Sequence, residues 1–368
     1  MDVLAAAAAK ERRGGSVVHM EVGQPSAPAP RAAREAAKAA LDAGRIGYTE
    51  ALGIAPLRER IARHYRESYG VAVAPERIVV TTGSSAGFVL AFLTLFDAGD
   101  RVAITAPGYP AYRNILEALD LVPVTIPLSK AEGWIMTAEA VERAHAQAPL
   151  KGVLAMSPAN PSGTMIGEAA LARLGETCRG LGLWFVSDEI YHGLTYTAPA
   201  ATALASDDDA VVINSFSKYY CMTGWRVGWI VVPERLVRPV ERLAQNLYIS
   251  PPYLSQVAAL AAFEAREELE AVKEGYARNR AMLLEELPRL GLSEMHPVDG
   301  AFYVYADVAR FTNDSIGFSR RMLEEAGVAA TPGLDFDLLE GGHYLRFSFA
   351  GSEEECREAV RRLKGWLR

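Results

Sequence analysis

Short apolar runs alternate with loops and amphipathic segments between Arg77 and Val232. The runs are rich in β-branched residues and have the length of buried strands; they lie at residues 78–82, 101–105, 152–156, 183–187 and 210–214. Strands that alternate with helices in this way are typical of a mainly parallel sheet with helices on both faces. The pattern therefore predicts an α/β protein whose large domain has three layers, α/β/α.

The chain on either side of this region follows another pattern. Residues 1–30 begin with a short helix candidate and continue as an arm rich in proline and alanine. A helix is expected at 234–247 with a kink at Pro239, and a long helical stretch then reaches to about Leu287. This stretch is expected to carry the chain out of the sheet region.

A smaller α+β domain is predicted for the C-terminal part of the chain. Strand candidates at 301–305 and 344–349 flank a helix candidate at 315–326. The last helix opens with a capping box at Ser352 and carries Cys356 on its apolar face. We expect an N-terminal arm that joins the small domain, then a large domain and a small domain, at residues 1–30, 31–250 and 251–368 respectively.

Candidate binding residues follow the strands, at the edge where ligands collect in such sheets. Gly83, Ser84 and Ser85 open a helix whose exposed backbone N–H groups suit a phosphate, although the same residues also serve as an ordinary helix start. Tyr109 is flanked by prolines, so it is either a platform for a flat ring or a packed residue in a rigid turn.

Two charged residues interrupt apolar strands. Asp188 ends the strand at 183–187, where a carboxylate is costly to bury unless it is paired; a pyridinium nitrogen is a suitable partner, and a cap on the following turn is the alternative. Arg346 lies within the strand at 344–349, which indicates an anionic partner such as a nearby Asp or Glu.

Lys218 follows the strand at 210–214, between hydroxyl and aromatic side chains and without an acidic neighbour in sequence. Such a lysine loses its proton more easily, and a neutral amine can attack an aldehyde. Arg226, further along the same loop, offers a fixed fork of donors that suits a phosphate. Taken alone, the two residues are equally consistent with a solvated lysine and a solvated arginine.

Composition narrows the class of protein. The chain has 368 residues, half of them hydrophobic, and a net charge of −7 with no basic run, which argues against a nucleic acid or an anionic membrane as partner. Its three cysteines are widely spaced and suggest neither a disulfide framework nor a metal site, so we expect a soluble, cytoplasmic protein. The glycine fingerprints of dinucleotide-binding and P-loop proteins do not occur.

The segment from Ser215 to Arg226, SFSKYYCMTGWR, resembles the Schiff-base lysine motif of class I/II aminotransferases. These enzymes use pyridoxal 5′-phosphate (PLP) on the aspartate-aminotransferase-like fold. The resemblance implies that Lys218 forms the internal aldimine, and that Ser215, Ser217 and Arg226 hold or flank the cofactor phosphate. The resemblance to this family extends over nearly the whole chain.

The other candidates match further segments of this family. By resemblance, Gly83, Ser84 and Ser85 bind the phosphate, Tyr109 stacks on the pyridine ring, and Asp188 keeps the ring nitrogen protonated. The turn Asn160-Pro161-Ser162-Gly163 matches the family's asparagine turn, which implies that Asn160 and Tyr191 donate to the ring oxygen. The resemblance further implies that Gly23 and Arg346 bind the substrate carboxylate and that Tyr48 reaches the phosphate of the neighbouring subunit.

We therefore predict a homodimeric, PLP-dependent aminotransferase that moves an amino group from an L-amino acid to a 2-oxo acid by a ping-pong mechanism. Lys218 would be the general base and acid, with Asp188 and Tyr191 as further catalytic residues. The alternative on the same fold is a cysteine-S-conjugate β-lyase or a decarboxylase. A PLP-sensing transcription regulator would need a basic DNA-binding module before the sheet domain, and none is found. The sequence does not indicate which amino acid is used.

Overall fold

The repeated strand–helix pattern folds into a seven-stranded sheet in the computed structural model, which describes residues 2–367. In spatial order the strands are β2 (Ile78–Thr81), β8 (Gly228–Val231), β7 (Val211–Ser215), β6 (Trp184–Asp188), β5 (Gly152–Met156), β3 (Arg101–Ala106) and β4 (Val122–Pro127). β8 runs antiparallel to β2 and β7, and the other neighbouring strands are parallel. The predicted mainly parallel sheet is confirmed.

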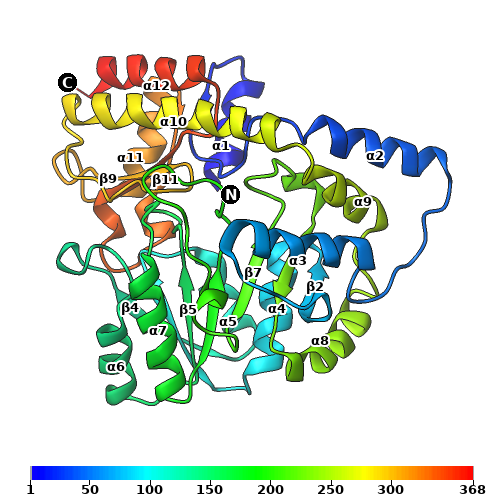
Figure 1. Cartoon of the computed structure of the whole chain (residues 1–368). Coiled ribbons are helices and arrows are strands. Elements are labelled where there is room, and N and C mark those ends of the chain that lie inside the picture. The colour runs from blue at the N-terminus through cyan, green and yellow to red at the C-terminus, as the bar shows by residue number, and fades with distance from the viewer. Residues whose placement is uncertain (1, 368) are drawn as a thin grey trace.

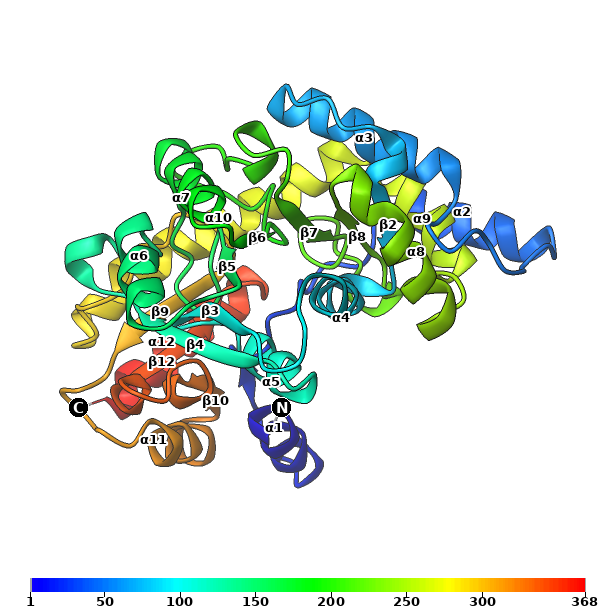
Figure 2. The same cartoon turned by 90° about the horizontal axis from the view of Figure 1, so that it is seen from below.

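Helices cover both faces of this sheet (Figure 2). One face carries α3 (Ala55–Tyr69), α6 (Ala138–Gln147) and α7 (Glu168–Gly180), and the other carries α4 (Gly83–Leu95), α5 (Pro110–Ala118) and α8 (Glu234–Leu247). Consecutive strand residues point to opposite faces. Phe185 and Val212 accordingly pack in the first core, whereas Val186 and Ile213 pack in the second. The three-layer α/β/α prediction is therefore confirmed.

A second, smaller group of elements lies above the large sheet in Figure 1. Its antiparallel sheet has the order β11 (Thr331–Pro332), β12 (Tyr344–Ser348), β9 (Tyr303–Asp307). Its helices are α1 (Asp2–Arg12), α10 (Arg266–Arg289), α11 (Ser315–Arg321) and α12 (Glu353–Trp366). The N-terminal strand β1 (Val18–His19) pairs in parallel with β10 (Val328–Ala329), so the arm lies against the C-terminal part of the chain. The domain boundaries at residues 30 and 250 stay predictions.

The long helical stretch expected after residue 252 is two helices, α9 (Tyr253–Ala262) and α10. Phe263 ends α9 by packing its ring against Phe216 and Tyr220, with ring centroids 5.4 and 5.1 Å away. The break is therefore a consequence of tertiary packing rather than of a local glycine or proline. α9 and α2 (Arg31–Asp42) pack with the core of the large sheet, and α8 continues through Pro239. Within residues 2–367, no helix is both long and apolar enough to cross a membrane.

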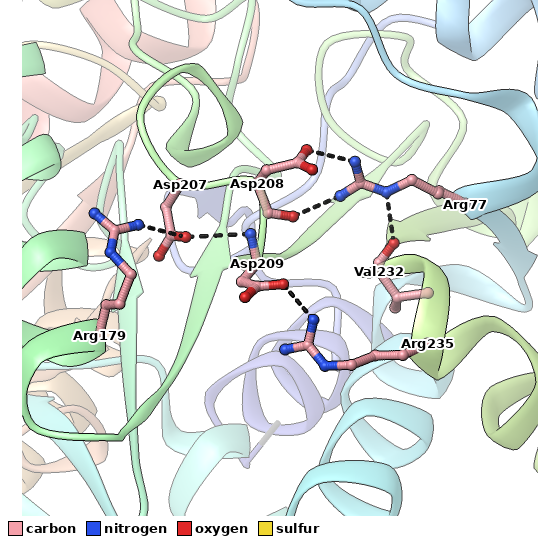
Figure 3. Close-up of polar contacts among 7 residues, drawn as sticks. All are labelled: Arg77, Arg179, Asp207, Asp208, Asp209, Val232 and Arg235. Atoms are coloured by element: carbon pink, nitrogen blue, oxygen red, sulfur yellow. Dashed lines mark hydrogen bonds and ion pairs between the residues drawn. The ribbon is translucent and has the colours of Figure 1, made fainter.

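Arg77 joins three segments at the end of the large sheet that is opposite to the Lys218 loop (Figure 3). It is 8% exposed, and its Nε donates to the carbonyl of Val232 at 2.9 Å. Its two Nη atoms donate to the side chain of Asp208 and, at 2.7 Å, to the Asp208 carbonyl. Since Asp208 precedes β7 and Val232 follows β8, this one guanidinium links the start of the edge strand β2 to the next two strands of the sheet.

Replacing Arg77 with alanine should lower the free energy of unfolding by about 1–3 kcal/mol, because the carbonyl of the buried residue Val232 and the carbonyl of Asp208 lose their donor. Urea denaturation measures this change. Arg235→Ala is the matched control: Arg235 pairs with Asp209 at the surface, where the side chains are 54% and 57% exposed, and should cost less than about 1 kcal/mol. Equal effects of the two variants would show that Arg77 contributes no more than a surface charge.

Candidate active site

Lys218 lies on the loop after β7, and its amine is buried against the N-terminal arm. Its Nζ donates to the carbonyl of Gly23 at 2.5 Å and lies 5.7 Å from the ring centroid of Tyr191. The pKa of Lys218 is lowered to about 8. Burial is the main cause and the charge of Arg346 acts in the same direction, whereas Asp188 opposes the shift. The neutral, nucleophilic form of the amine is therefore far more populated at neutral pH than in an exposed lysine.

Asp188 is the last residue of β6, and its carboxylate is only 2% exposed. One oxygen accepts from the hydroxyl of Tyr112, and the other accepts from the backbone N–H of Ile190 at 3.1 Å. Burial raises the pKa of Asp188 to about 6, while these two hydrogen bonds act in the opposite direction. A buried carboxylate with a raised pKa favours a cationic partner, such as a protonated ring nitrogen.

Arg226 lies directly against the first turn of α4. A Cβ added to Gly83 would be 2.3 Å from Nη2 of Arg226, so only glycine allows this approach. Ser84 and Ser85 belong to the same turn, whose unpaired backbone N–H groups favour an anion. A guanidinium next to a helix N-terminus is a suitable site for a phosphate.

The two serines before Lys218 are buried and linked to each other. The Ser215 hydroxyl makes hydrogen bonds with Oγ of Ser217 at 2.9 Å and with the carbonyl of Val227 at 3.1 Å. The Ser217 N–H in turn donates to the Ser215 hydroxyl at 3.1 Å. These contacts fix the loop that carries Lys218, and the Val227 contact ties it to the segment next to Arg226.

Arg346, on β12, is 6% exposed. Its Nη1 donates to Oδ1 of Asn160 at 2.8 Å, and its Nη2 donates to the carbonyl of Glu21 at 2.6 Å. Its Nε is buried and has no hydrogen-bond partner within residues 2–367. Since Asn160 accepts through its oxygen, its amide N–H groups remain free to donate elsewhere. Within the described residues, Arg346 forms no ion pair with an Asp or Glu, the partner that its position in the strand suggested. Its Nε therefore remains available to donate to the carboxylate of a ligand.

The aromatic candidates fall into two groups. Tyr191 is buried, whereas Tyr109 is 37% exposed at the start of α5, with its ring edge-on to Tyr112 at a centroid distance of 5.4 Å. Tyr191 lies beside Lys218, whose Nζ is 5.7 Å from the tyrosine ring centroid, and the pKa of Tyr109 is raised by burial and by the charge of Asp188. Both tyrosines therefore belong to the same site as Lys218 and Asp188. Tyr48 is different: it is 82% exposed and makes no hydrogen bond to these residues within the described chain.

Three contacts of this site were not anticipated from the sequence. Tyr112, which binds Asp188, lies three residues after Tyr109 on the same helix, and this spacing was an available signal. The ring centroids of Tyr303 and Phe336 lie 4.3 and 4.8 Å from the guanidinium carbon of Arg346. No local sequence signal links these two aromatics to the site.

Comparison with known proteins identifies the family. The sequence matches the family Aminotransferase class I and II over residues 16–363. It is 49% identical to the valine–pyruvate aminotransferase of Mycobacterium tuberculosis, over 100% of this chain and 95% of that protein. It is 35% identical to the (5-formylfuran-3-yl)methyl phosphate transaminase of Methanocaldococcus jannaschii, over 100% of this chain and 96% of that protein.

Solved structures give the same result. An aminotransferase from Mycobacterium tuberculosis superposes with a TM-score of 0.97 at 49% identity, covering 100% of this chain and 95% of that one. Aspartate aminotransferase from Thermus thermophilus, solved with maleate, superposes with a TM-score of 0.93 at 32% identity, covering 99% and 95%. The lyase and decarboxylase alternatives are not favoured, since close relatives are named aminotransferases. The chain belongs to the class I and II aminotransferases, and its reaction is transamination.

Proposed function

We propose that this aminotransferase carries pyridoxal phosphate on Lys218 and transfers the amino group of a neutral L-amino acid to a 2-oxo acid. The observation that carries the proposal is the buried Lys218 amine, with its pKa lowered to about 8, next to the charges of Asp188 and Arg346. An amine in this state suits an aldehyde, and Asp188 suits a pyridinium nitrogen. The contact of Arg226 with Gly83 at the start of α4 suits the cofactor phosphate.

The substrate carboxylate is assigned to Arg346. Its buried, unpartnered Nε supports this role, because a guanidinium binds a carboxylate through two parallel N–H donors. The contacts of Tyr303 and Phe336 with the guanidinium support it further, since aromatic rings at 4.3 and 4.8 Å restrict the orientation of the planar fork. The backbone of Gly23 is assigned to the same end of the substrate, because the arm contacts both Lys218 and Arg346.

The chemistry divides between the cofactor and the chain. When bound, pyridoxal phosphate withdraws electrons from Cα of the amino acid. With the cofactor in place, the Lys218 amine would take the proton from Cα as general base and would return it as general acid. Asp188 holds the proton on the ring nitrogen, while Asn160 and Tyr191 orient the ring through its oxygen. Arg346 fixes the carboxylate, so that Cα stays within reach of Lys218.

A neutral side chain is proposed for the substrate. The charges that act on the Lys218 amine are those of Arg346, Asp188 and Arg226, each of which already has a proposed partner. No further cation among them is available for the second carboxylate of a dicarboxylic amino acid. The 49% identical relative named valine–pyruvate aminotransferase supports valine as donor and pyruvate as acceptor.

Stopped-flow or quench measurements with valine alone test this function. We expect one equivalent of 2-oxo acid per site and then a halt, because the amino group stays on the enzyme until a second oxo acid accepts it. Adding pyruvate should restart turnover, and initial rates should follow ping-pong kinetics. Continuous release of ammonia without an oxo acid would contradict transamination as the principal reaction.

We further propose a two-fold dimer in which Tyr48 completes the neighbouring site. Four large side chains, Ile46, Tyr48, Leu247 and Ile249, are 48–82% exposed, which is unusual for a free surface. Their segments lie side by side, because the N–H of Thr49 donates to the Ser250 hydroxyl at 3.3 Å. Ile46 and Tyr48 lie between α2 and α3, and Leu247 and Ile249 lie where α8 leads to α9, so a second copy bound there would bury all four.

Hybrid dimers test this assembly. A Tyr48→Phe or Tyr48→Ala variant and a Lys218→Ala variant should each be impaired, but their mixture should regain activity, because one site of each hybrid combines a native Tyr48 with a native Lys218. Up to about a quarter of all sites would be native after full exchange of subunits. Activity of the mixture equal to the mean of the two variants, together with a monomeric mass by light scattering, would contradict the dimer.

The cellular setting is also a proposal. All three cysteines, Cys178, Cys221 and Cys356, are buried free thiols, which favours a reducing compartment such as the cytoplasm. The net charge of −7 gives no support to a nucleic acid partner.

A further inference from the structure

Tyr303, the first residue of β9, contacts three parts of the proposed site at once. Its ring lies 4.3 Å from the guanidinium carbon of Arg346, and its hydroxyl lies 2.6 Å from the hydroxyl of Tyr191. A Cβ added to Gly23 would be only 2.1 Å from the Tyr303 hydroxyl oxygen, so the backbone of the N-terminal arm packs directly against this hydroxyl. Tyr303 is 1% exposed, and the sequence offered no reason to assign it a role in the site.

The ring of Tyr303 fixes the orientation of Arg346. The ring of Phe336 also packs against this guanidinium, with its centroid 4.8 Å from the same carbon, so two aromatic rings contact the planar group. Its Nη atoms are bonded to Asn160 and to the Glu21 carbonyl within that plane. Nη2 also donates to the Thr331 hydroxyl at 3.2 Å, whereas the buried Nε has no hydrogen-bond partner within residues 2–367. By contacting the guanidinium, the aromatic rings help to fix the direction of this Nε.

The hydroxyl of Tyr303 acts on Tyr191. Burial raises the pKa of both phenols, so each keeps its single proton at neutral pH. If Tyr191 is to donate its proton to the ring oxygen of the cofactor, the proton in the contact between the two tyrosines must come from Tyr303. A hydroxyl that accepts a hydrogen bond becomes a stronger donor, so the Tyr303 hydroxyl would strengthen the bond that Tyr191 makes.

We propose that Tyr303 is a positioning residue that couples the two ends of the site: its ring holds Arg346 for the substrate carboxylate, and its hydroxyl orients and strengthens Tyr191 toward the cofactor ring oxygen. The inference rests on the proposed function, since it assumes pyridoxal phosphate on Lys218. The two roles belong to different atoms of one side chain, and substitutions can separate them.

Tyr303→Phe removes the hydroxyl and keeps the ring. The readout is a pH titration of the visible absorbance of the loaded protein, which follows the proton on the nitrogen that joins Lys218 to the cofactor. A weaker bond from Tyr191 leaves more negative charge on the ring oxygen to stabilise that proton. The titration midpoint should therefore rise, by about 0.5–1 pH unit, and Tyr191→Phe should raise it further.

Tyr305→Phe is the matched control. Tyr305 lies two residues along the same strand, is equally buried, and has a hydroxyl without a hydrogen-bond partner in the described chain. Its removal should leave the midpoint where it is in the parent protein. The double variant Tyr191→Phe with Tyr303→Phe should titrate like Tyr191→Phe alone, because the Tyr303 hydroxyl acts only through Tyr191.

Tyr303→Leu removes the ring as well. Binding of isovalerate, which is the carbon skeleton of valine without its amine, should weaken by about 5- to 30-fold in this variant, through loss of the cation–π contact on Arg346. In Tyr303→Phe the same binding should change less than about twofold, since the ring remains. The comparison of the two variants isolates the ring from the hydroxyl.

A midpoint in Tyr303→Phe equal to that of the parent, while Tyr191→Phe shifts it, would overturn the role of the hydroxyl. Equal isovalerate affinity in Tyr303→Leu and Tyr303→Phe would overturn the role of the ring. If Tyr303→Leu does not fold, the phenylalanine variants and the double variant still decide the first role, and Phe336→Leu tests the second aromatic contact of Arg346. A parent protein without visible absorbance in the presence of pyridoxal phosphate would instead refute the proposed function.

Discussion

Replacing Lys218 with alanine is expected to abolish covalent binding of the cofactor and to lower turnover by about 10²–10⁴-fold or more. The variant loses both the amine that bonds to the aldehyde and the group that moves the Cα proton. Its visible absorbance should no longer respond to borohydride, and mass spectrometry after reduction should find no cofactor attached to the chain. Pyridoxal phosphate held by Arg226 and Asp188 alone should still bind, but should dialyse away.

The pH dependence of cofactor capture gives a second readout for Lys218. Because burial lowers the pKa of this amine to about 8 from the usual 10.5, the neutral form increases as the pH rises and predominates above about 8. The rate at which cofactor-free protein captures pyridoxal phosphate should rise with pH and level off above that value. Lys130→Ala, at a side chain that is 79% exposed, is the control and should match the parent. A Lys218→Ala protein that still reacts with borohydride would refute the assignment.

Asp188→Asn should lower kcat by roughly 10²–10³-fold, since a neutral amide cannot hold a proton on the ring nitrogen of the cofactor. Cofactor affinity should fall less, because the phosphate contacts are distant from this change. The parent protein should also lose cofactor affinity as the pH drops below about 6, where the raised pKa of Asp188 allows the carboxyl to become neutral. The asparagine variant should lack this acid limb.

Asp97→Asn is the control for the same chemical change, because Asp97 lies exposed in the loop after α4. Its kinetics and its pH profile of cofactor affinity should equal those of the parent. Normal kcat in Asp188→Asn, with an unchanged acid limb, would show that the carboxylate is only a cap on the turn before Tyr191.

The features that the sequence predicted well are those with a local signal. The apolar runs around Asp188 and Lys218 identify strands, and the parallel arrangement then places the residues that follow them at one edge of the sheet. Contacts such as those of Lys218 with Tyr191 follow from that placement. β4 was not anticipated, because it is an edge strand with exposed residues and a proline near each end, at Pro123 and Pro127.

The remaining contacts depend on the tertiary fold. Tyr303 reads as one more residue of a buried strand, and only the packing of β9 against the arm and the large domain brings it to Tyr191. The partners of Lys218 and Arg346 on the arm are backbone carbonyls, which every residue possesses and no sequence pattern distinguishes. The break between α9 and α10 likewise depends on the packing of Phe263 against Phe216 and Tyr220, which are distant in sequence.

The contacts of the arm have a consequence for biogenesis. The hydrogen bond from Arg346 to Glu21 spans 325 residues, and the one from Lys218 to Gly23 spans 195. The large sheet can form during synthesis, as N-terminal domains generally do, but the arm has no partner strand and no guanidinium to bind until β10 and β12 have left the ribosome. During that interval the arm and the Lys218 loop remain open to chaperones and proteases. All residues proposed to hold the cofactor precede β9, whereas Arg346, proposed for the substrate carboxylate, lies on β12. The nascent chain is therefore expected to be able to bind its cofactor before it can bind its substrate.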